Sequence, residues 1–366
     1  MCGIAGYISF SGPSTVPSAF VDYATRQLRH RGPDGTGLLS AHSDQVICAS
    51  PAAEAQAFPD LPWRPTQEWA AVATRPAVLA LGHNRLSIYD TSTAGHQPMC
   101  TPDRQHWIVF NGAIYNFKTL RTELEKAGFS FLTDTDTEVI LAAYQHWGQQ
   151  CLEHFEGMYA FMIWDRAQQR LWGARDRTGV KPLYWYRDDK GFAFASEQKA
   201  LWQAPGVQTA LRPAGIVANL FTRELDAHPE GLFTGIHGLL PGHSLTVQLQ
   251  EAEIETRALP LPASIAPPHD PIPAIREALQ HSIHLRGQAD VPIGVAVSGG
   301  LDSSIVAGTL QALGHEQLPA FTATFPGFQF DESAYAAMMV EHIQGAWHTV
   351  TPTATDFWQD LQDLVY

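Results

Sequence analysis

The chain has 366 residues and a formal net charge of −14 at pH 7, because 23 lysines and arginines face 37 aspartates and glutamates. This length is enough for two domains with separate cores. The acidic balance, without any basic cluster, argues against nucleic acid or an anionic membrane surface as a partner. No apolar run approaches the ~18 residues of a membrane span, and the start of the chain lacks the features of a signal peptide. We therefore expect a cytoplasmic protein.

In chain order, short β-like runs dominate the first 258 residues and three helical segments interrupt them. Strands are expected at 3–10, 77–81, 107–111, 160–165, 170–174, 183–187 and 192–196, and helices at 17–28, 116–127 and 137–146. Many strands with few helices favour an α+β arrangement in which helices cover sheets.

Two proline-bearing stretches divide the chain. Residues 259–273 contain six prolines in fifteen positions, so we expect an extended connector there. Residues 50–65 resemble a long surface loop inserted between strands, for which the sequence suggests no role. After the connector, strands at 291–297, 320–325 and 347–351 alternate with helices at 303–313, 332–343 and from 355 onward. This alternation is typical of a parallel α/β sheet.

The four cysteines are far apart and form no CxxC pair: Cys2, Cys48, Cys100 and Cys151. They indicate reduced thiols and not a disulfide framework or a zinc site. The 16 histidines include no HExxH motif or tight cluster, so no structural metal is expected.

The first residues, MCGIAG, place the thiol of Cys2 directly behind the initiator Met1. Removal of Met1 would leave Cys2 with a free α-amine, whose ordinary pKa of about 8 lets it accept the thiol proton near neutral pH. Nucleophile and base would then belong to one residue. The alternative is that a cysteine stands here by accident.

The sequence SGGLDSS at 298–304 follows a buried strand and opens a helix. Paired glycines let the backbone approach a ligand closely, and the helix N-terminus adds free amides, so a phosphate or pyrophosphate site is predicted. The alternative is a generic Gly-Ser turn. The pattern is not a Walker loop. It resembles the SGGxDS loop of the ATP pyrophosphatases.

Together, MCGIAG and SGGLDSS make the chain similar to the glutamine-hydrolysing asparagine synthetases. Seven further segments carry the resemblance: RHRGPD at 29–34, HNRLSI at 83–88, NGAIYN at 111–116, TDTE at 135–138, RDRTGVKPLY at 175–184, ASEQKAL at 195–201 and FDES at 330–333. Cys2 with the Asn-Gly segment would also suit glucosamine-phosphate synthases or amidophosphoribosyltransferases. The SGGLDSS loop separates the chain from both.

The resemblance implies a fold and a domain plan. An Ntn-hydrolase-like αββα sandwich forms the glutamine amidotransferase domain at 2–215. An extension and proline-rich linker follow at 216–271. Residues 272–366 form an incomplete α/β parallel-sheet ATP-pyrophosphatase domain.

The resemblance also assigns roles to residues of the first domain. Cys2 attacks the side-chain amide of glutamine. Asn111 and Gly112 form the oxyanion hole, where one preorganised donor can contribute ~3 kcal/mol. Arg85 pairs with the glutamine α-carboxylate.

Asp136 takes the α-ammonium of glutamine in the same scheme. Without the resemblance, Arg85 would be interpreted as a surface arginine, Asn111 and Gly112 as an Asn-Gly turn, and Asp136 as a helix-capping aspartate. The backbone of Ala113 lines the site, although the family usually has glutamate there, which puts glutamine affinity in doubt. Residues 31–35 resemble the loop that closes over glutamine.

For the second domain the resemblance implies ATP, with Mg²⁺ as its companion and Asp302 as a candidate ligand. The ATP or pyrophosphate contacts are expected at Val297, Ser298, Gly299, Gly300, Asp302, Ser303 and Ala323. The implied reaction uses glutamine, aspartate and ATP and yields asparagine, glutamate, AMP and pyrophosphate. A homodimer is one assembly compatible with the resemblance.

Two other functions stay open on the sequence. A relative could amidate a different carboxylate, or the chain could be a stand-alone glutaminase or glutamine-sensing module. Family members continue well beyond residue 366, so we expect an incomplete gene product, the alternative being a naturally short protein. As it stands, the chain is expected to hydrolyse glutamine but not to make asparagine.

Overall fold

The computed structural model describes all residues except 43, 52–57, 222–228 and 261–268. Parts of the expected inserted loop (52–57), of the extension (222–228) and of the connector (261–268) therefore lie outside the described residues. The chain divides into two compact units, Met1–Pro262 and Ala263–Tyr366.

The first unit contains two stacked sheets. In the described part of the chain, the larger sheet has eight strands in the spatial order β12 (His237–Gly238), β10 (Tyr184–Arg187), β11 (Gly191–Ala195), β1 (Gly3–Ser9), β5 (Leu79–Arg85), β2 (Gly35–His42), β3 (Gln45–Ser50) and β4 (Gln67–Glu68). The smaller has six, in the order β14 (Glu253–Ala258), β13 (His243–Gln248), β9 (Arg170–Arg175), β8 (Gly157–Asp165), β7 (His106–Ile114) and β6 (Met99–Cys100). The sheets extend past residue 215, because β12 and β13 pair with β10 and β9.

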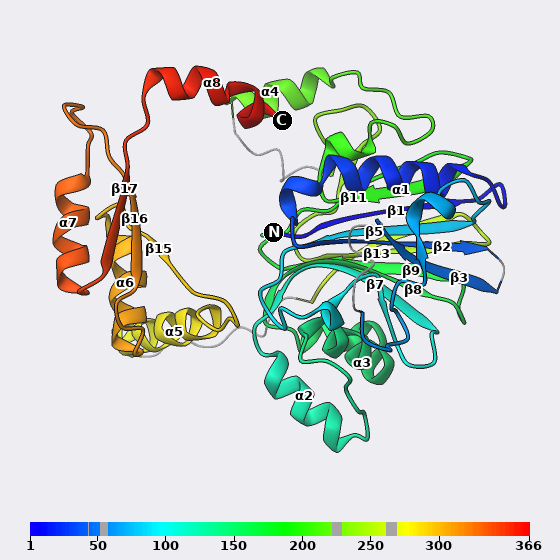
Figure 1. Ribbon diagram of the computed structural model, residues 1–366, viewed down its shortest axis with the longest axis horizontal. Helices are drawn as coiled ribbons and strands as arrows, with labels where there is room; N and C mark the ends of the chain where they lie inside the picture. The colour runs from blue at the N-terminus through cyan, green and yellow to red at the C-terminus, as the bar shows by residue number, and fades with distance from the viewer. Residues whose placement is uncertain (43, 52–57, 222–228, 261–268) are drawn as a thin grey trace. The chain divides into compact units, whose positions relative to one another are not determined.

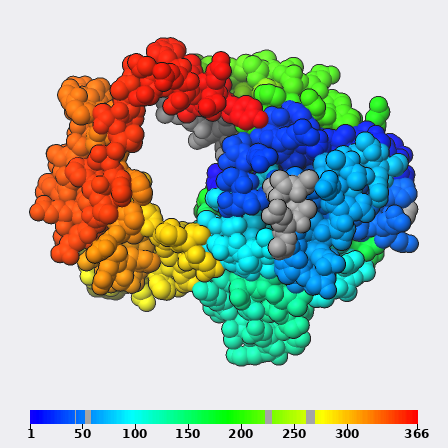
Figure 2. All heavy atoms as spheres, in the orientation of Figure 1, coloured from blue at the N-terminus to red at the C-terminus, as the bar shows by residue number. Residues whose placement is uncertain are grey.

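Helices cover both outer faces of this pair of sheets (Figure 1). α1 (Val16–Gln27) packs on β1 and β5, whereas α2 (Phe117–Lys126) and α3 (Asp136–Trp147) lie on the side of β7. In Figure 2 the atoms of α2, in cyan-green, protrude from the first unit. Every residue of β1 is buried, as expected for a strand covered on both faces. The expected α+β arrangement of helix-covered sheets is confirmed.

Shorter helical elements connect these layers. They are the 3₁₀ helices Arg29–Arg31, Trp69–Ala71, Thr93–Gly95, Gly148–Glu153 and Gln198–Leu201, and α4 (Pro213–Phe221).

Within its described residues, the second unit contains a three-stranded parallel sheet in the order β15 (Val295–Ala296), β16 (Pro319–Ala323) and β17 (Ala346–Val350). Its helices are α5 (Pro271–Arg286), α6 (Leu301–Ala312), α7 (Ser333–His342) and α8 (Ala354–Val365). Its core is small and includes Val297, Leu310 and Ile343. The predicted parallel α/β class is confirmed.

One predicted strand of this unit is much shorter than expected. The sequence predicted 291–297, but only Val295 and Ala296 pair with β16. Pro292 has no N–H to donate to a ladder, so the segment before residue 295 cannot extend the pairing fully.

Within the described residues, no helix has the length and apolar character that a membrane crossing requires.

Candidate active site

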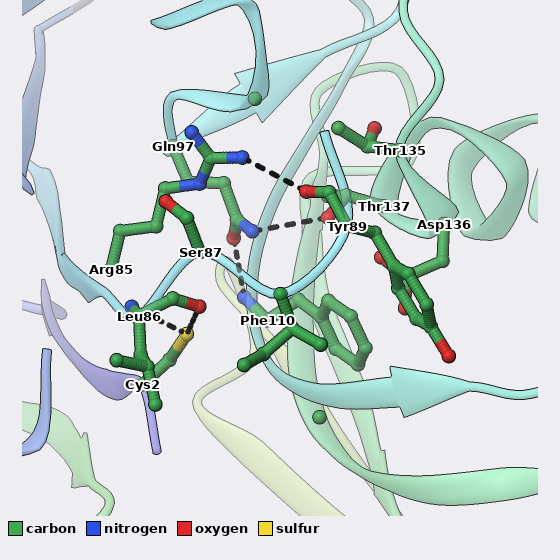
Figure 3. A pocket seen from close by; sticks show the side chains of 13 residues that line it. Cys2, Arg85, Leu86, Ser87, Tyr89, Gln97, Phe110, Thr135, Asp136 and Thr137 are labelled. Atoms are coloured by element: carbon green, nitrogen blue, oxygen red, sulfur yellow. Dashed lines mark hydrogen bonds between the residues drawn. The ribbon is translucent and has the colours of Figure 1, made fainter. Parts of the chain in front are cut away.

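Cys2 lies at the start of β1, beside the loop that follows β5. Gly3 pairs with Asn84 near the end of β5, so Leu86, which follows this strand, lies beside the Cys2 thiol. The Cys2 Sγ–H donates to the Leu86 carbonyl over 3.6 Å, and the Leu86 N–H donates to Sγ over 3.3 Å (Figure 3). A Cβ at Gly3 would come within 2.8 Å of Leu28, so glycine allows β1 to pass this closely.

A buried arginine holds the backbone of Cys2. The Arg31 Nε donates to the Cys2 carbonyl over 2.9 Å, and its Nη1 donates to the Glu197 carboxylate over 2.7 Å. Partial burial acts to raise the pKa of Glu197, but the hydrogen bond and charge of Arg31 bring it below its ordinary value. The ion pair therefore fixes a guanidinium against the residue that carries the thiol.

Arg31→Gln is expected to lower kcat for glutamine hydrolysis by about thirtyfold, because a charge-assisted bond that positions Cys2 is lost. KM should change much less, since Arg31 does not line the pocket. Steady-state glutamate release measures both constants. Arg29→Gln, at an exposed arginine two positions away, is the matched control and should behave as the parent. Equal kcat in the two variants would refute the positioning role.

A pocket opens beside Cys2 between the two sheets. Thirteen residues line it: Cys2, Arg85, Leu86, Ser87, Ile88, Tyr89, Gly95, Gln97, Phe110, Gly112, Thr135, Asp136 and Thr137. Its volume is about 30 Å³, which is room for about two water molecules.

Arg85, the last residue of β5, folds its guanidinium over its own loop. Nη1 donates to the Ser92 carbonyl over 2.5 Å, and Nη2 donates to the carbonyls of Tyr89 and Asp90. A Cβ at Gly95 would come within 2.0 Å of Nη2, so glycine makes room for the guanidinium. Three of the five N–H donors of Arg85 are thereby engaged, and the others remain for an anion at the pocket rim.

Asp136 begins α3 on the opposite wall. Its carboxylate accepts the Ile114 N–H over 2.9 Å, and the side chain is almost fully buried. Burial raises the pKa of Asp136 to about 7, although backbone N–H donors and Arg85 act in the opposite direction. A bound ammonium group would shift the balance to the charged carboxylate.

In the Asn111–Gly112–Ala113 segment of β7, Asn111 and Ala113 are buried, and only the partly exposed Gly112 lines the pocket. A Cβ at Gly112 would come within 2.2 Å of the Met158 carbonyl, so only glycine fits there. The Asn111 side chain is fully buried, and neither of its polar atoms has a partner among the described residues. Such a group is rare in a folded protein. Ala113 is buried as well, facing Met158 in the ladder.

Burial shifts the pKa of the Cys2 thiol and the pKa of the Met1 α-amine toward the neutral form of each group. Burial raises the pKa of the Cys2 thiol, although the Leu86 N–H and the nearby amine lower it in part. Burial lowers the pKa of the α-amine at Met1. This amine belongs to Met1, whereas a self-activating N-terminal nucleophile uses the α-amine of Cys2, which removal of Met1 would expose in the same buried place.

Gln97 was missed by sequence reasoning and ties three parts of the pocket together. Its Oε1 accepts the Phe110 N–H over 2.7 Å, and its Nε2 donates to Thr137 Oγ1 over 3.1 Å (Figure 3). A lone glutamine gives no sequence signal for such a role. Arg31 and Glu197 stood in motifs carrying the resemblance, but their joint action on Cys2 was not foreseen.

The second unit presents its Gly-rich loop between β15 and α6. Ser298 Oγ accepts the Gly300 N–H over 3.2 Å and lies 3.1 Å from Ser303 Oγ. Gly299 has φ +84°, and a Cβ there would come within 2.5 Å of the Ala336 N. The loop thus packs tightly against α7 and leads into the free amides of a 12-residue helix.

The remaining predicted contacts lie along the same sheet edge. Val297 is buried, its N–H donating to the Phe321 carbonyl over 2.9 Å, and Ala323 is exposed at the end of the parallel strand β16. Asp302 is exposed in the first turn of α6. Among the described residues no three His, Cys, Asp or Glu side chains converge as a metal site. One carboxylate beside phosphate groups still suits Mg²⁺, which usually keeps several waters.

Comparisons with known proteins agree with this division. Residues 68–258 match the glutamine amidotransferase domain family, and residues 274–366 match the asparagine synthase family. The chain is 33% identical over 274 residues to asparagine synthetase [glutamine-hydrolyzing] 1 of Bacillus subtilis strain 168, covering 72% of this chain and 42% of that protein. It is also 33% identical over 241 residues to the amidase chyE of Penicillium rubens, covering 64% and 35%.

A solved structure is also similar in fold. The phosphoribosylpyrophosphate amidotransferase of B. subtilis superposes with a TM-score of 0.51 at 17% identity, covering 98% of this chain and 70% of that one. This likeness concerns the fold, which is that of the Ntn-hydrolase-type glutamine amidotransferases. The chain spans about half the length of the curated relatives it matches. By its two domains and its relatives, the chain belongs to the family of glutamine-hydrolysing asparagine synthetases.

Proposed function

We propose that the first unit hydrolyses glutamine at Cys2 and that its ammonia amidates an ATP-activated aspartate at the second unit. The observation that carries the proposal is the convergence of Cys2, Arg85, Gly112 and Asp136 on one pocket. A thiol, a cation, a backbone donor and a carboxylate are the groups that an α-amino acid amide requires.

Glutamine would lie with its α-carboxylate on Arg85 and its α-ammonium on Asp136. After removal of Met1, the Cys2 amine takes the thiol proton and the sulfur attacks the side-chain carbonyl. The Gly112 N–H and the unpaired Asn111 amide would receive the developing oxyanion. Collapse releases ammonia, and water hydrolyses the thioester to glutamate.

Arg85→Lys is expected to lower kcat/KM for glutamine by about thirtyfold, although the charge is kept. Lysine lacks the planar fork that pairs with a carboxylate, and one lost charge-assisted contact costs about 2 kcal/mol. Kinetics at varied glutamine concentration test this. Arg26→Lys is the matched control, because its side chain is 74% exposed on α1. An unchanged kcat/KM in Arg85→Lys would mean that Arg85 stabilises its loop and does not bind the glutamine carboxylate.

In the second unit, the Ser298–Ser304 loop would take the phosphates of ATP, with Mg²⁺ bound mainly through those phosphates and Asp302. Adenylation of the aspartate β-carboxylate would release pyrophosphate, and ammonia would displace AMP to give asparagine. The free amides and positive end of α6 support the phosphate contacts.

Neighbouring glycines offer a sharp test of the nucleotide loop. Gly299→Ala should weaken ATP binding at least tenfold, because φ +84° disfavours alanine and its Cβ meets α7 at 2.5 Å. Gly300→Ala should be tolerated, since its Cβ comes no closer than 3.3 Å to Ser298 Oγ. Titration with ATP, beside a thermal melt of each variant, separates lost binding from lost folding. Equal ATP affinities would contradict a backbone-built phosphate site.

A second candidate is amidation of a carboxylate other than aspartate. The similarity to a protein named as an amidase favours keeping it open. Incubating the protein with ATP, glutamine and labelled aspartate distinguishes the two. Labelled asparagine supports the first proposal, whereas amidation of another carboxylate that depends on ATP and glutamine supports the second.

A further inference from the structure

Two adjoining cavities lie at the opposite end of the sandwich from Cys2. On β5, Leu79 lines one of them and Arg85 lines the Cys2 pocket, six residue steps or about 20 Å away. Each cavity measures about 410 Å³, which falls within the range of small-molecule sites. They share Asp44 and Arg166 in their walls.

One of these cavities carries an uncompensated positive charge. Arg75, Arg104 and Arg166 line it, with Asp44 as its only acidic lining residue. Three positive charges against one negative leave +2, in a chain whose net charge is −14. None of the three guanidinium groups makes an ion pair with a carboxylate in the described part of the chain. Such a cluster attracts anions, and phosphate matches the guanidinium fork well.

Arg166 is held in place by its surroundings. Its backbone N–H donates to the Gln105 carbonyl over 3.0 Å, and its guanidinium donates to the carbonyls of Arg104 and Asp44, each over 3.3 Å. The guanidinium also lies 5.7 Å from the centre of the Trp164 ring. Two carbonyl contacts leave three of its five N–H donors for a ligand.

The walls of the other cavity are part apolar and part polar. Its walls include the Trp164 ring and the aliphatic side chains of Val78, Leu79 and Leu249. The indole N–H of Trp164 is buried and shielded from the cavity, but the side-chain amides of Gln105 and Gln169 line it. A flat heterocycle suits such walls, because it buries apolar area and carries polar ring atoms that can pair with side-chain amides.

We propose that the two cavities together bind a nucleoside monophosphate. The phosphate lies among Arg75, Arg104 and Arg166, and the base packs beside Trp164. This site is separate from the Gly-rich loop of the second unit and from the Cys2 pocket.

Calorimetric titration of the full chain with AMP, adenosine and inorganic phosphate tests the proposal. AMP should bind at least tenfold more tightly than adenosine or inorganic phosphate, because AMP alone can occupy both cavities. The double variant Arg104→Gln/Arg166→Gln should lose at least tenfold in AMP affinity at this site. Arg187→Gln, at an exposed arginine on β10, is the matched control and should bind AMP as the parent does.

Three outcomes overturn the proposal: unchanged AMP binding in the double variant, equal affinity for AMP and inorganic phosphate, or no AMP binding by the parent. A folding defect is recognised by a thermal melt and by glutamine hydrolysis. Because hydrolysis at Cys2 is measured separately, failure here leaves the proposed function untouched. A crystal soaked with AMP and showing density between Arg166 and Trp164 would support the site directly.

Discussion

Cys2→Ala is expected to abolish glutamine hydrolysis, lowering the rate by at least about 10³-fold, while the protein keeps its fold. The substitution removes the sulfur that the pocket presents and only a weak hydrogen-bonding pair with Leu86. Glutamate release measures the activity, and circular dichroism with a thermal melt measures the fold. Cys48→Ala removes a buried thiol outside the pocket and is the matched control. A Cys2→Ala protein that released glutamate at the parent rate would rule out this nucleophile.

The same mechanism makes the N-terminus itself testable. Protein that retains Met1 should be nearly inactive, because the Cys2 nitrogen is then an amide and cannot accept a proton. Mass spectrometry of active fractions reports the state of the N-terminus. Retained Met1 in fully active protein would mean that another group is the base.

Among the longer strands of the sandwich, the sequence missed β2, β3, β13 and β14. Gly35 and Gly37 open β2, and glycine weakens a strand signal. The reason for Gly37 is tertiary, because a Cβ there would meet the Gln97 carbonyl at 1.9 Å. No local pattern carries such information.

In the candidate site, too, local motifs predicted some residues, whereas others are determined only by tertiary packing. Motifs brought Cys2, Arg85 and Asp136 forward, and these side chains line one pocket. The Arg31–Glu197 pair could not be predicted, because its partners are 166 residues apart and meet only in the folded chain. The loop contacts of Arg85 likewise depend on packing that no local motif encodes.

Asp136→Asn is expected to raise KM for glutamine at least a hundredfold and to change its pH dependence. Losing the carboxylate leaves the substrate ammonium without a counter-charge in a buried site. Because burial raises the pKa of Asp136 to about 7, kcat/KM of the parent should fall about tenfold per pH unit below pH 7. In Asp136→Asn, kcat/KM should no longer show this decrease below pH 7. Asp134→Asn is the matched control, since that carboxylate is 87% exposed.

Stability gives an independent readout of the same carboxyl group. Between about pH 4 and pH 7 the unfolded chain has lost the Asp136 proton while the folded chain retains it, so the folded state binds more protons. The free energy of unfolding therefore falls as pH rises through this window, by up to about 4 kcal/mol from this one group. Asp136→Asn should remove that contribution and flatten the curve of denaturant midpoint against pH. If Asp136→Asn kept both the decrease of kcat/KM below pH 7 and the fall in unfolding free energy between about pH 4 and pH 7, another group would be titrating. Asp136 would then not be the partner of the substrate ammonium.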